Sequence, residues 1–325
     1  MRTHTAKWLF ALGWLILLLV ACSETADPPV ALGTIIATYS SNNPSNYVLC
    51  IAWSPDGKWL AAGESDGTIQ VWKTTTRTIV FTAHAHAGHV WSIAWSPDGR
   101  RLASASWDHT VQVWNVPTGK KVLTYRGHMD LVLAVAWSPD GTRIASAGSD
   151  NTVQVWNAAT GEHLLTYQGH SKTVETLAWS PDGKHLASAS FDTTVQVWDP
   201  STGKTLVTYR GHSKYVWALT WSPDGTRIAS GSTDDTVQVW EADTGKKLLT
   251  YRGHSNGIQA LAWSPDGKHI ASGSWDTTVQ IWDATTGSRV YTYHHHTDIV
   301  IAVAWSPDST RIASVALDVQ VWQAS

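Results

Sequence analysis

The sequence repeats itself every 42 residues. Trp-Ser-Pro-Asp occurs seven times, beginning at residues 53, 95, 137, 179, 221, 263 and 305. A second motif, Val/Ile-Gln-Val/Ile-Trp, follows each copy and ends at residues 72, 114, 156, 198, 240, 282 and 322. A fixed period of this length indicates an array of like supersecondary units that bury their apolar faces against one another. The two motifs also explain why the chain has 21 Trp but only 3 Phe.

Each copy reads as four short strands separated by turns. In the fourth copy we expect strands over 174–179, 185–189, 194–198 and 204–209. Ser180-Pro181-Asp182-Gly183 is a turn with proline at its second position, and Asp192-Thr193 lies in the next turn. No segment has helical periodicity, and such strand spacing is typical of the blade of an all-β propeller.

These motifs resemble those of the WD-repeat family over residues 34–325. The resemblance consists of the period, a Gly-His before the first strand, an Asp between the second and third strands, and a Trp that ends the third. It implies an all-β, seven-bladed β-propeller with four-stranded antiparallel blades. In that family the His, a Ser or Thr of the second strand, the Asp and the Trp form a hydrogen-bonded tetrad in each blade.

Tetrads carry over by register onto five blades. In the second copy the register selects His86 rather than His89 of the literal Gly-His pair. The first copy departs, with Pro44 and Ala62 at the His and Ser positions, and the last keeps His296 and Ser314 but loses two residues after Asp318, so these two tetrads stay open. The implied tetrads are His86, Ser104, Asp108, Trp114; His128, Ser146, Asp150, Trp156; His170, Ser188, Asp192, Trp198; His212, Ser230, Asp234, Trp240; and His254, Ser272, Asp276, Trp282.

The last copy stops immediately after its third strand. Residues 34–39, Thr-Ile-Ile-Ala-Thr-Tyr, precede the first blade and resemble a fourth strand such as 247–251. We therefore expect residues 34–39 to pair with the C-terminal blade and to close the ring without a covalent link.

The first 22 residues read as an export signal. Arg2 and Lys7 precede the apolar run 8–20, which is too short for an ordinary membrane span. The run ends in Leu-Val-Ala-Cys22, which resembles the lipobox of bacterial lipoproteins. The resemblance implies a signal peptide over 1–21, a lipid on Cys22, a spacer over 22–33 and an extracytoplasmic propeller held at the cell membrane or outer membrane. The alternative is a soluble secreted protein with a chance Cys at the cleavage point.

Three positions in each copy vary while their neighbours barely change. They lie six and four residues before the first-strand Trp, and immediately before the turn Asp. In a propeller these positions share one end of the disc, around the mouth of the central channel. The apolar residues among them are expected to bind a partner, although some could merely fill the funnel: Tyr47, Trp91, Trp107, Leu131, Leu133, Phe191, Tyr215, Trp217, Trp275, Ile299, Ile301 and Leu317.

Other chemistry has little support in the sequence. Without Arg2 and Lys7 the chain has 21 basic and 26 acidic residues, which argues against nucleic acid. The run 294–296 with Asp298 could hold a metal, but no Cys or carboxylate stands at a recognisable ligand spacing, so a solvated loop is favoured. Cys50, in an apolar run, reads as a buried small hydrophobe.

We expect a monomeric, non-enzymatic scaffold without cofactors that binds a protein or peptide. An envelope-assembly component of low specificity is the alternative, and a carbohydrate-binding or enzymatic propeller ranks below both. The ring of varied apolar positions is what favours the scaffold.

Overall fold

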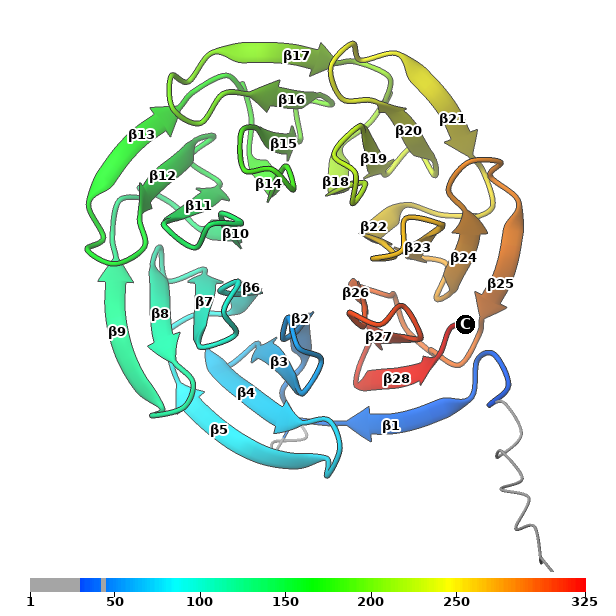
Figure 1. Ribbon diagram of the computed structural model, residues 1–325, viewed down its shortest axis with the longest axis horizontal. Coiled ribbons are helices and arrows are strands. Elements are labelled where there is room, and N and C mark those ends of the chain that lie inside the picture. The colour runs from blue at the N-terminus through cyan, green and yellow to red at the C-terminus, as the bar shows by residue number, and fades with distance from the viewer. Residues whose placement is uncertain (1–29, 42–44) are drawn as a thin grey trace, which may run out of the picture. The chain divides into compact units, whose positions relative to one another are not determined.

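The computed structural model describes residues 30–41 and 45–325. Within these residues, the compact unit Ala31–Ser325 contains 28 strands in seven four-stranded antiparallel sheets around a central channel (Figure 1). The seven-bladed β-propeller expected from the 42-residue period is confirmed. The expected signal peptide, the lipidation of Cys22 and the tetrad position of Pro44 lie outside the described residues.

We call the four strands of a blade a to d, from the channel outward. The a strands are β2 (Val48–Trp53), β6 (Val90–Trp95), β10 (Val132–Trp137), β14 (Val174–Trp179), β18 (Val216–Trp221), β22 (Ile258–Trp263) and β26 (Ala302–Trp305). The b strands are β3 (Trp59–Glu64), β7 (Arg101–Ser106), β11 (Arg143–Gly148), β15 (Leu186–Ser190), β19 (Arg227–Ser232), β23 (His269–Ser274) and β27 (Arg311–Val315). The c strands are β4 (Thr68–Lys73), β8 (Val111–Asn115), β12 (Val153–Asn157), β16 (Val195–Trp198), β20 (Val237–Glu241), β24 (Val279–Asp283) and β28 (Val319–Gln323). The d strands are β5 (Thr78–His84), β9 (Lys120–Tyr125), β13 (His163–Tyr167), β17 (Thr205–Tyr209), β21 (Lys247–Tyr251), β25 (Arg289–Tyr293) and β1 (Ile35–Tyr39).

The N-terminal strand closes the ring, as expected. β1 pairs antiparallel with β28, with Tyr39 opposite Val319 and Ile35 opposite Trp322. The Gly33 amide donates to the Gln323 carbonyl at 2.8 Å and extends this ladder. The Tyr39 ring then packs on Trp72 of the first blade at 5.2 Å between centroids. One strand therefore completes the last blade and also contacts the next one.

Five of the seven tryptophans that end the a strands donate a hydrogen bond to the preceding blade. The Trp95 indole donates to the Ala52 carbonyl of the preceding blade at 3.1 Å, and Trp221 donates likewise to Ala178 at 3.0 Å. At the closing junction Trp53 donates to Ala304, 251 residues away, at 3.2 Å. These indoles bury apolar area and also satisfy a carbonyl across each of these interfaces. Sequence reasoning had given them no role.

The tryptophans of the c strands form a second set. The Trp198 ring stacks on Tyr167, from strand d of the preceding blade, at 4.2 Å and an interplanar angle of 3°. Five c-strand tryptophans stack in this way on a tyrosine. The core is therefore a circle of inter-blade clusters, each built from two adjacent blades.

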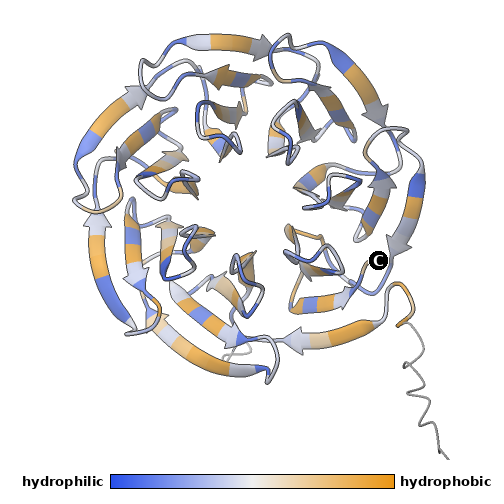
Figure 2. Ribbon diagram, viewed as in Figure 1, coloured by the Kyte–Doolittle hydropathy of each residue, from blue (hydrophilic) through white to orange (hydrophobic). Residues whose placement is uncertain are grey.

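The outer d strands present aliphatic side chains to solvent. Leu164, Leu206 and Leu248 are 47%, 45% and 46% exposed, and Figure 2 shows hydrophobic residues along these strands. No helix long and apolar enough to cross a bilayer occurs in residues 30–41 and 45–325.

Candidate functional site

Two of the three varied positions meet at one end of the blades through a backbone hydrogen bond. The Trp107 amide donates to the His89 carbonyl, Phe191 to Thr173, and Trp275 to Gly257, each at 3.0 Å. The equivalent bond occurs in blades 1, 3 and 5, so six blades share it among the described residues. The b–c turn and the start of strand a therefore lie side by side. We call the apolar residues at these two positions the rim: Tyr47, Trp107, Leu131, Phe191, Tyr215, Trp275, Ile299 and Leu317.

A β-bulge directs the third varied position into the channel. In blade 4, Val174 pairs with Ser190 and Thr176 pairs with Ala189, so Glu175 between them has no cross-strand partner. The same register shift occurs in β2, β6, β10, β18 and β22. An unpaired bulge residue can turn its side chain away from the regular alternation. The sequence pattern gave no sign of these bulges.

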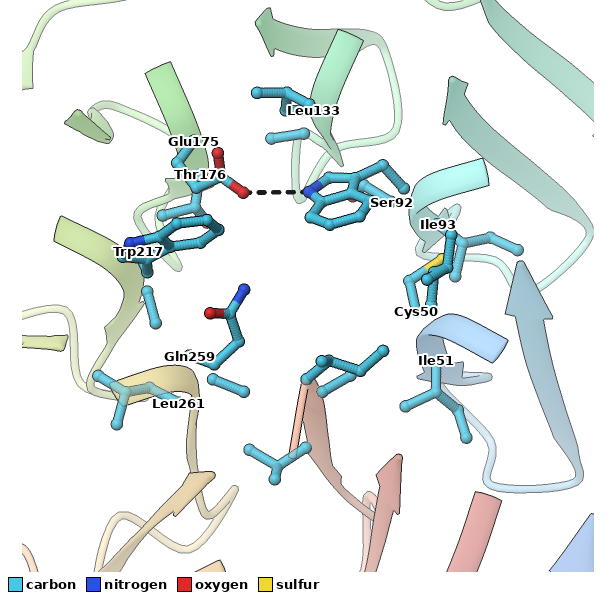
Figure 3. A pocket seen from close by; sticks show the side chains of 18 of the residues that line it. Cys50, Ile51, Ser92, Ile93, Leu133, Glu175, Thr176, Trp217, Gln259 and Leu261 are labelled. Atoms are coloured by element: carbon cyan, nitrogen blue, oxygen red, sulfur yellow. Dashed lines mark hydrogen bonds between the residues drawn. The ribbon is translucent and has the colours of Figure 1, made fainter. Parts of the chain in front are cut away.

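The bulge residues line a cavity of about 210 Å³ in the channel. Its wall includes Trp91, Leu133, Glu175, Trp217, Gln259 and Ile301. Figure 3 shows Glu175, Trp217 and Gln259 along one side of the opening, Leu133 beside Glu175, and Ile93 on the opposite side. Because these residues stand at the beginnings of the a strands, the cavity opens at the rim end of the disc.

Aromatic side chains form two clusters at this end. Trp91 lies 5.2 Å from Trp107, measured between ring centroids. In the second cluster, Phe191 stacks on Tyr215 at 4.8 Å and contacts Trp217 at 5.0 Å. Trp217 in turn meets Trp275 edge-on at 6.1 Å. The varied aromatic positions therefore contact one another and form a preassembled surface.

The expected partner-binding residues differ in their exposure. Tyr47, Tyr215, Ile299 and Leu317 are exposed, at 54%, 44%, 41% and 49%. The tryptophans, Phe191, Leu131 and Ile301 are partly buried. Leu133 is only 7% exposed, because the bulge turns it into the channel wall. Leu133 therefore lies in the wall of the channel cavity and not among the exposed rim residues.

Glu175 is the unusual member of the channel wall. Its side chain is buried, and the Trp91 indole, from two blades away, donates to its Oε1 atom at 3.0 Å. Burial raises the pKa of Glu175 to about 8, although the hydrogen bond from Trp91 acts in the opposite direction. Near neutral pH the carboxyl group is therefore largely protonated.

The tetrad residues lie within hydrogen-bonding distance inside the blades. In blade 4, His170 Nδ1 lies 2.9 Å from Asp192 Oδ2 and its Nε2 lies 2.9 Å from Ser188 Oγ. The Trp198 indole donates to the same Ser188 oxygen at 3.2 Å. An imidazole whose Nδ1–H donates to the Asp leaves Nε2 to accept from the Ser hydroxyl. Blades 3, 5 and 6 have the same geometry, and the four residues connect strands a to c from within.

The tetrad aspartates are held in their charged form. Although burial alone raises the pKa of Asp150, hydrogen bonds from His128 and Thr152 and the electrostatic interaction with His128 lower it to about 2. The pKa values of Asp108, Asp192, Asp234 and Asp276 are lowered further by the same kind of contacts. These carboxylates orient imidazoles inside the blades and play no part at the rim.

Blade 2 does not complete its tetrad. His86, Ser104 and Asp108 are joined as expected, but the buried Trp114 Nε1 has no hydrogen-bond partner among the described residues. The physical reason lies in strand d of the preceding blade. There Ala83 stands opposite Ile69, at the position where strand d of blade 2 has Tyr125 opposite Val111. Without a tyrosine to stack on, Trp114 packs on Phe81 at a 53° tilt.

Blade 7 keeps three of the four partners. His296 Nε2 lies 2.6 Å from Ser314 Oγ, and Trp322 donates to that oxygen at 3.0 Å. His296 Nδ1 has no partner among the described residues, because the shortened turn leaves Asp318 bonded to Gln320 instead. Burial lowers the pKa of His296 to about 4. The neighbouring His294 and His295 are exposed, and no group of three or more His, Cys, Asp or Glu within residues 30–41 and 45–325 is arranged to hold a metal.

Comparison with known proteins identifies the repeats. The family model for the WD domain, G-beta repeat, matches residues 33–73, 203–241, 245–283 and 287–318. A model described as the first β-propeller of IFT122 matches residues 89–203. Together these matches extend over all seven blades.

Curated relatives match shorter segments. The human U5 small nuclear ribonucleoprotein 40 kDa protein is 45% identical over 47 residues, which is 14% of this chain and 13% of that protein. The probable cytosolic iron-sulfur protein assembly protein 1 of Cryptococcus neoformans is 57% identical over 28 residues, 9% of this chain and 6% of its own length. The Arabidopsis thaliana Notchless protein homolog is 51% identical over 35 residues, 11% and 7% of the two chains. The chain thus aligns with no more than 13% of the length of each of these relatives.

Proposed function

We propose that this chain of WD40 repeats, closed into a seven-bladed propeller, is a scaffold that binds a protein or peptide partner at its rim. The observation that carries the proposal is the aromatic surface around the channel mouth. The repeats are nearly identical elsewhere, yet at this surface they differ from blade to blade. Seven like blades thereby present seven different side-chain sets on one rigid frame.

The composition of the rim fits protein recognition. Aromatic side chains supply large contact area with few rotatable bonds, and they dominate the binding energy of many interfaces. Phe191, Tyr215 and Trp217 already contact one another, so little side-chain entropy is lost when a partner binds. The names of the relatives, which include a ribonucleoprotein component and a probable assembly protein, accord with a role in complexes.

The role we propose is non-catalytic. Glu175 is the sole carboxyl group among the described residues that line the channel cavity. The cavity's one thiol belongs to Cys50, and burial raises its pKa to about 12, so it stays protonated and is a poor nucleophile. The tetrad Ser, His and Asp side chains are engaged with one another inside the blades.

Replacement of Trp107, Tyr215 and Trp275 by Ala together is expected to abolish partner capture. Interface residues of this kind each contribute on the order of 2 kcal/mol, about 30-fold in Kd. The partner is first isolated on immobilised propeller and identified by mass spectrometry, and its Kd for each variant is then measured.

The matched control changes Leu164, Leu206 and Leu248 to Ala. These leucines are apolar and as exposed as Tyr215, but they lie on the outer strands β13, β17 and β21. We expect the control to bind like the unchanged protein. An unaltered Kd in the rim variant, or an equal loss in the control, would refute the rim as the binding surface.

We further propose that the propeller is tethered to a membrane through a lipid on Cys22, which makes the scaffold extracytoplasmic. The support is the sequence alone: two basic residues, the apolar run 8–20 and the lipobox-like Leu-Val-Ala-Cys22. Intact mass measurement of the protein expressed in a bacterium is expected to show a chain that begins at residue 22 and carries a diacylglycerol. Cys22→Ser should move the propeller from the membrane to the soluble fraction, and a variant that stays in the membrane would contradict the tether.

A further inference from the structure

Among the described residues, the cavity wall contains one acidic side chain, Glu175. None of the described residues that line the cavity is a Lys, Arg or His. Glu175 is 6% exposed, and its side chain points into the opening (Figure 3). Among the described residues its carboxyl group has a single hydrogen-bond partner, the Trp91 indole. This carboxyl group is therefore desolvated and lacks a counterion.

Packing does not explain an acid at this place. The equivalent residues of blades 1, 3 and 7 are Leu49, Leu133 and Ile301, which fill the same ring without a polar group. A buried carboxylate without a cation is costly, and a neutral aliphatic side chain avoids that cost. The cost of burial is visible in the pKa of Glu175, which burial raises to about 8. A ligand that supplies the missing positive charge would remove this penalty.

The groups around Glu175 are those that accommodate an organic cation. The indoles of Trp91 and Trp217 line the same cavity, and the face of an indole attracts ammonium and guanidinium groups. The Gln259 amide extends into the opening from the neighbouring side (Figure 3). The cavity volume of about 210 Å³ lies below the roughly 300–1,000 Å³ typical of pockets for drug-sized ligands. One alkyl chain with a charged end is a suitable occupant.

We propose that the channel mouth binds an alkylammonium or guanidinium group, with Glu175 as its counterion and the indoles of Trp91 and Trp217 against its alkyl chain and charge. The cation is either the side chain of a lysine or arginine in a partner held on the rim, or a free small amine. The first source rests on the proposed function, since the cavity opens among the rim residues. The second source stands without it.

Binding of the cation is coupled to loss of the proton from Glu175. The a and b strands packed against β14, namely β10, β15 and β18, contain no titratable side chain, and Arg143 begins β11 at the end away from the rim. Cys50 is the other titratable group in the cavity wall, and its thiol stays protonated because burial raises its pKa to about 12. Because the cation binds only the ionised carboxylate, its affinity rises with pH as Glu175 loses its proton in the free protein. Above the pKa of Glu175 the affinity no longer changes with pH.

Calorimetric titration with n-butylammonium and n-butylguanidinium tests the proposal. With a pKa of about 8 in the free protein, affinity at pH 6 is expected to be on the order of 100-fold weaker than at pH 9. The neutral n-pentanol, of similar length, should bind weakly and without pH dependence. Equal binding of pentanol and butylammonium, or cation binding that does not change with pH, would overturn the proposal.

Two Glu→Gln variants separate the effect of the Glu175 charge on cation binding from the effect of removing any one negative charge from the protein. Glu175→Gln keeps an acceptor for the Trp91 indole and removes the buried acid, so it should fold, which its melting transition verifies. It is expected to bind butylammonium at least tenfold more weakly at pH 9 and to lose the pH dependence. Glu162→Gln, on an exposed c–d turn, should behave like the unchanged protein. Unaltered cation binding in Glu175→Gln would refute the site.

Further experiments identify whether the cation is a partner side chain or a free amine, and they test the channel site separately from partner binding at the rim. A blocked peptide with one lysine, compared with the same peptide carrying norleucine, binds preferentially if the cation is a side chain. Butylammonium binding without lysine preference assigns the site to a free amine. A variant with the exposed rim residues Tyr47, Ile299 and Leu317 replaced by Ala should weaken partner binding but retain butylammonium. Conversely, partner capture that persists alongside absent cation binding refutes the channel site and leaves the rim intact.

Discussion

Removal of residues 34–39 is expected to abolish the cooperative unfolding of the propeller. β1, continued by Thr34 and Gly33, supplies the backbone partners on the outer edge of β28, and Ala37 and Tyr39 belong to the core cluster that joins the last blade to the first. Without this strand, the edge of β28 is unpaired, and Trp72 loses its contact with Tyr39. Because each blade is stabilised by two neighbours, the break exposes both sides of one junction. Near-ultraviolet circular dichroism during urea unfolding measures the loss through the tryptophan signals.

A rearranged chain is the control for this deletion. Residues 34–39 can be moved behind Ser325 through a turn copied from residues 200–204, which connects strands c and d of blade 4. The rearranged chain offers the same strand to β28 and is expected to regain a single transition. A truncated chain that unfolds at the same urea concentration as the full chain would show that the ring does not depend on β1.

Trp198→Ala is expected to destabilise the protein by about 3–5 kcal/mol, the usual cost of removing a large buried aromatic side chain. Trp198 is fully buried and stacks on Tyr167. Its loss also leaves the Ser188 hydroxyl, which bonds His170, with one hydrogen bond fewer inside the blade. The free energy of unfolding from urea titration gives the value directly.

Two Trp→Phe changes separate the hydrogen bond from the ring. Trp198→Phe removes an indole N–H that donates to Ser188, whereas Trp114→Phe removes one that has no partner in the described part of the chain. We expect Trp198→Phe to cost about 1 kcal/mol more, the net value of one hydrogen bond. Equal costs at the two positions would mean that the indole N–H of Trp198 contributes nothing to the tetrad.

The fold could be derived from the sequence because its information is periodic. A 42-residue repeat with four strand-like segments leaves few arrangements, and the missing last strand pointed to residues 34–39 as its replacement. The strand bounds of blade 4 differed from expectation by only one residue, as with β15 at Leu186–Ser190. Alternation of side chains along a strand carries this kind of information reliably.

The site could be derived only in part. Comparison of the copies found the positions that vary, but it did not reveal the bulges that aim Glu175 and Leu133 into the channel. A bulge is one unpaired residue on one strand, and its sequence looks like that of any strand. The bond between Trp91 and Glu175 likewise spans two blades and has no local signature. The incomplete tetrad of blade 2 followed from Ala83 in a neighbouring blade, beyond the motif that defines the tetrad.

Hydrogen–deuterium exchange of the propeller with and without its captured partner tests the rim most directly. The account predicts that protection is confined to the b–c turns and the starts of the a strands, such as residues 89–91, 107–109 and 215–217. The outer strands β13, β17 and β21 should exchange as in the free protein. Protection of these outer strands, with the channel mouth unchanged, would contradict it.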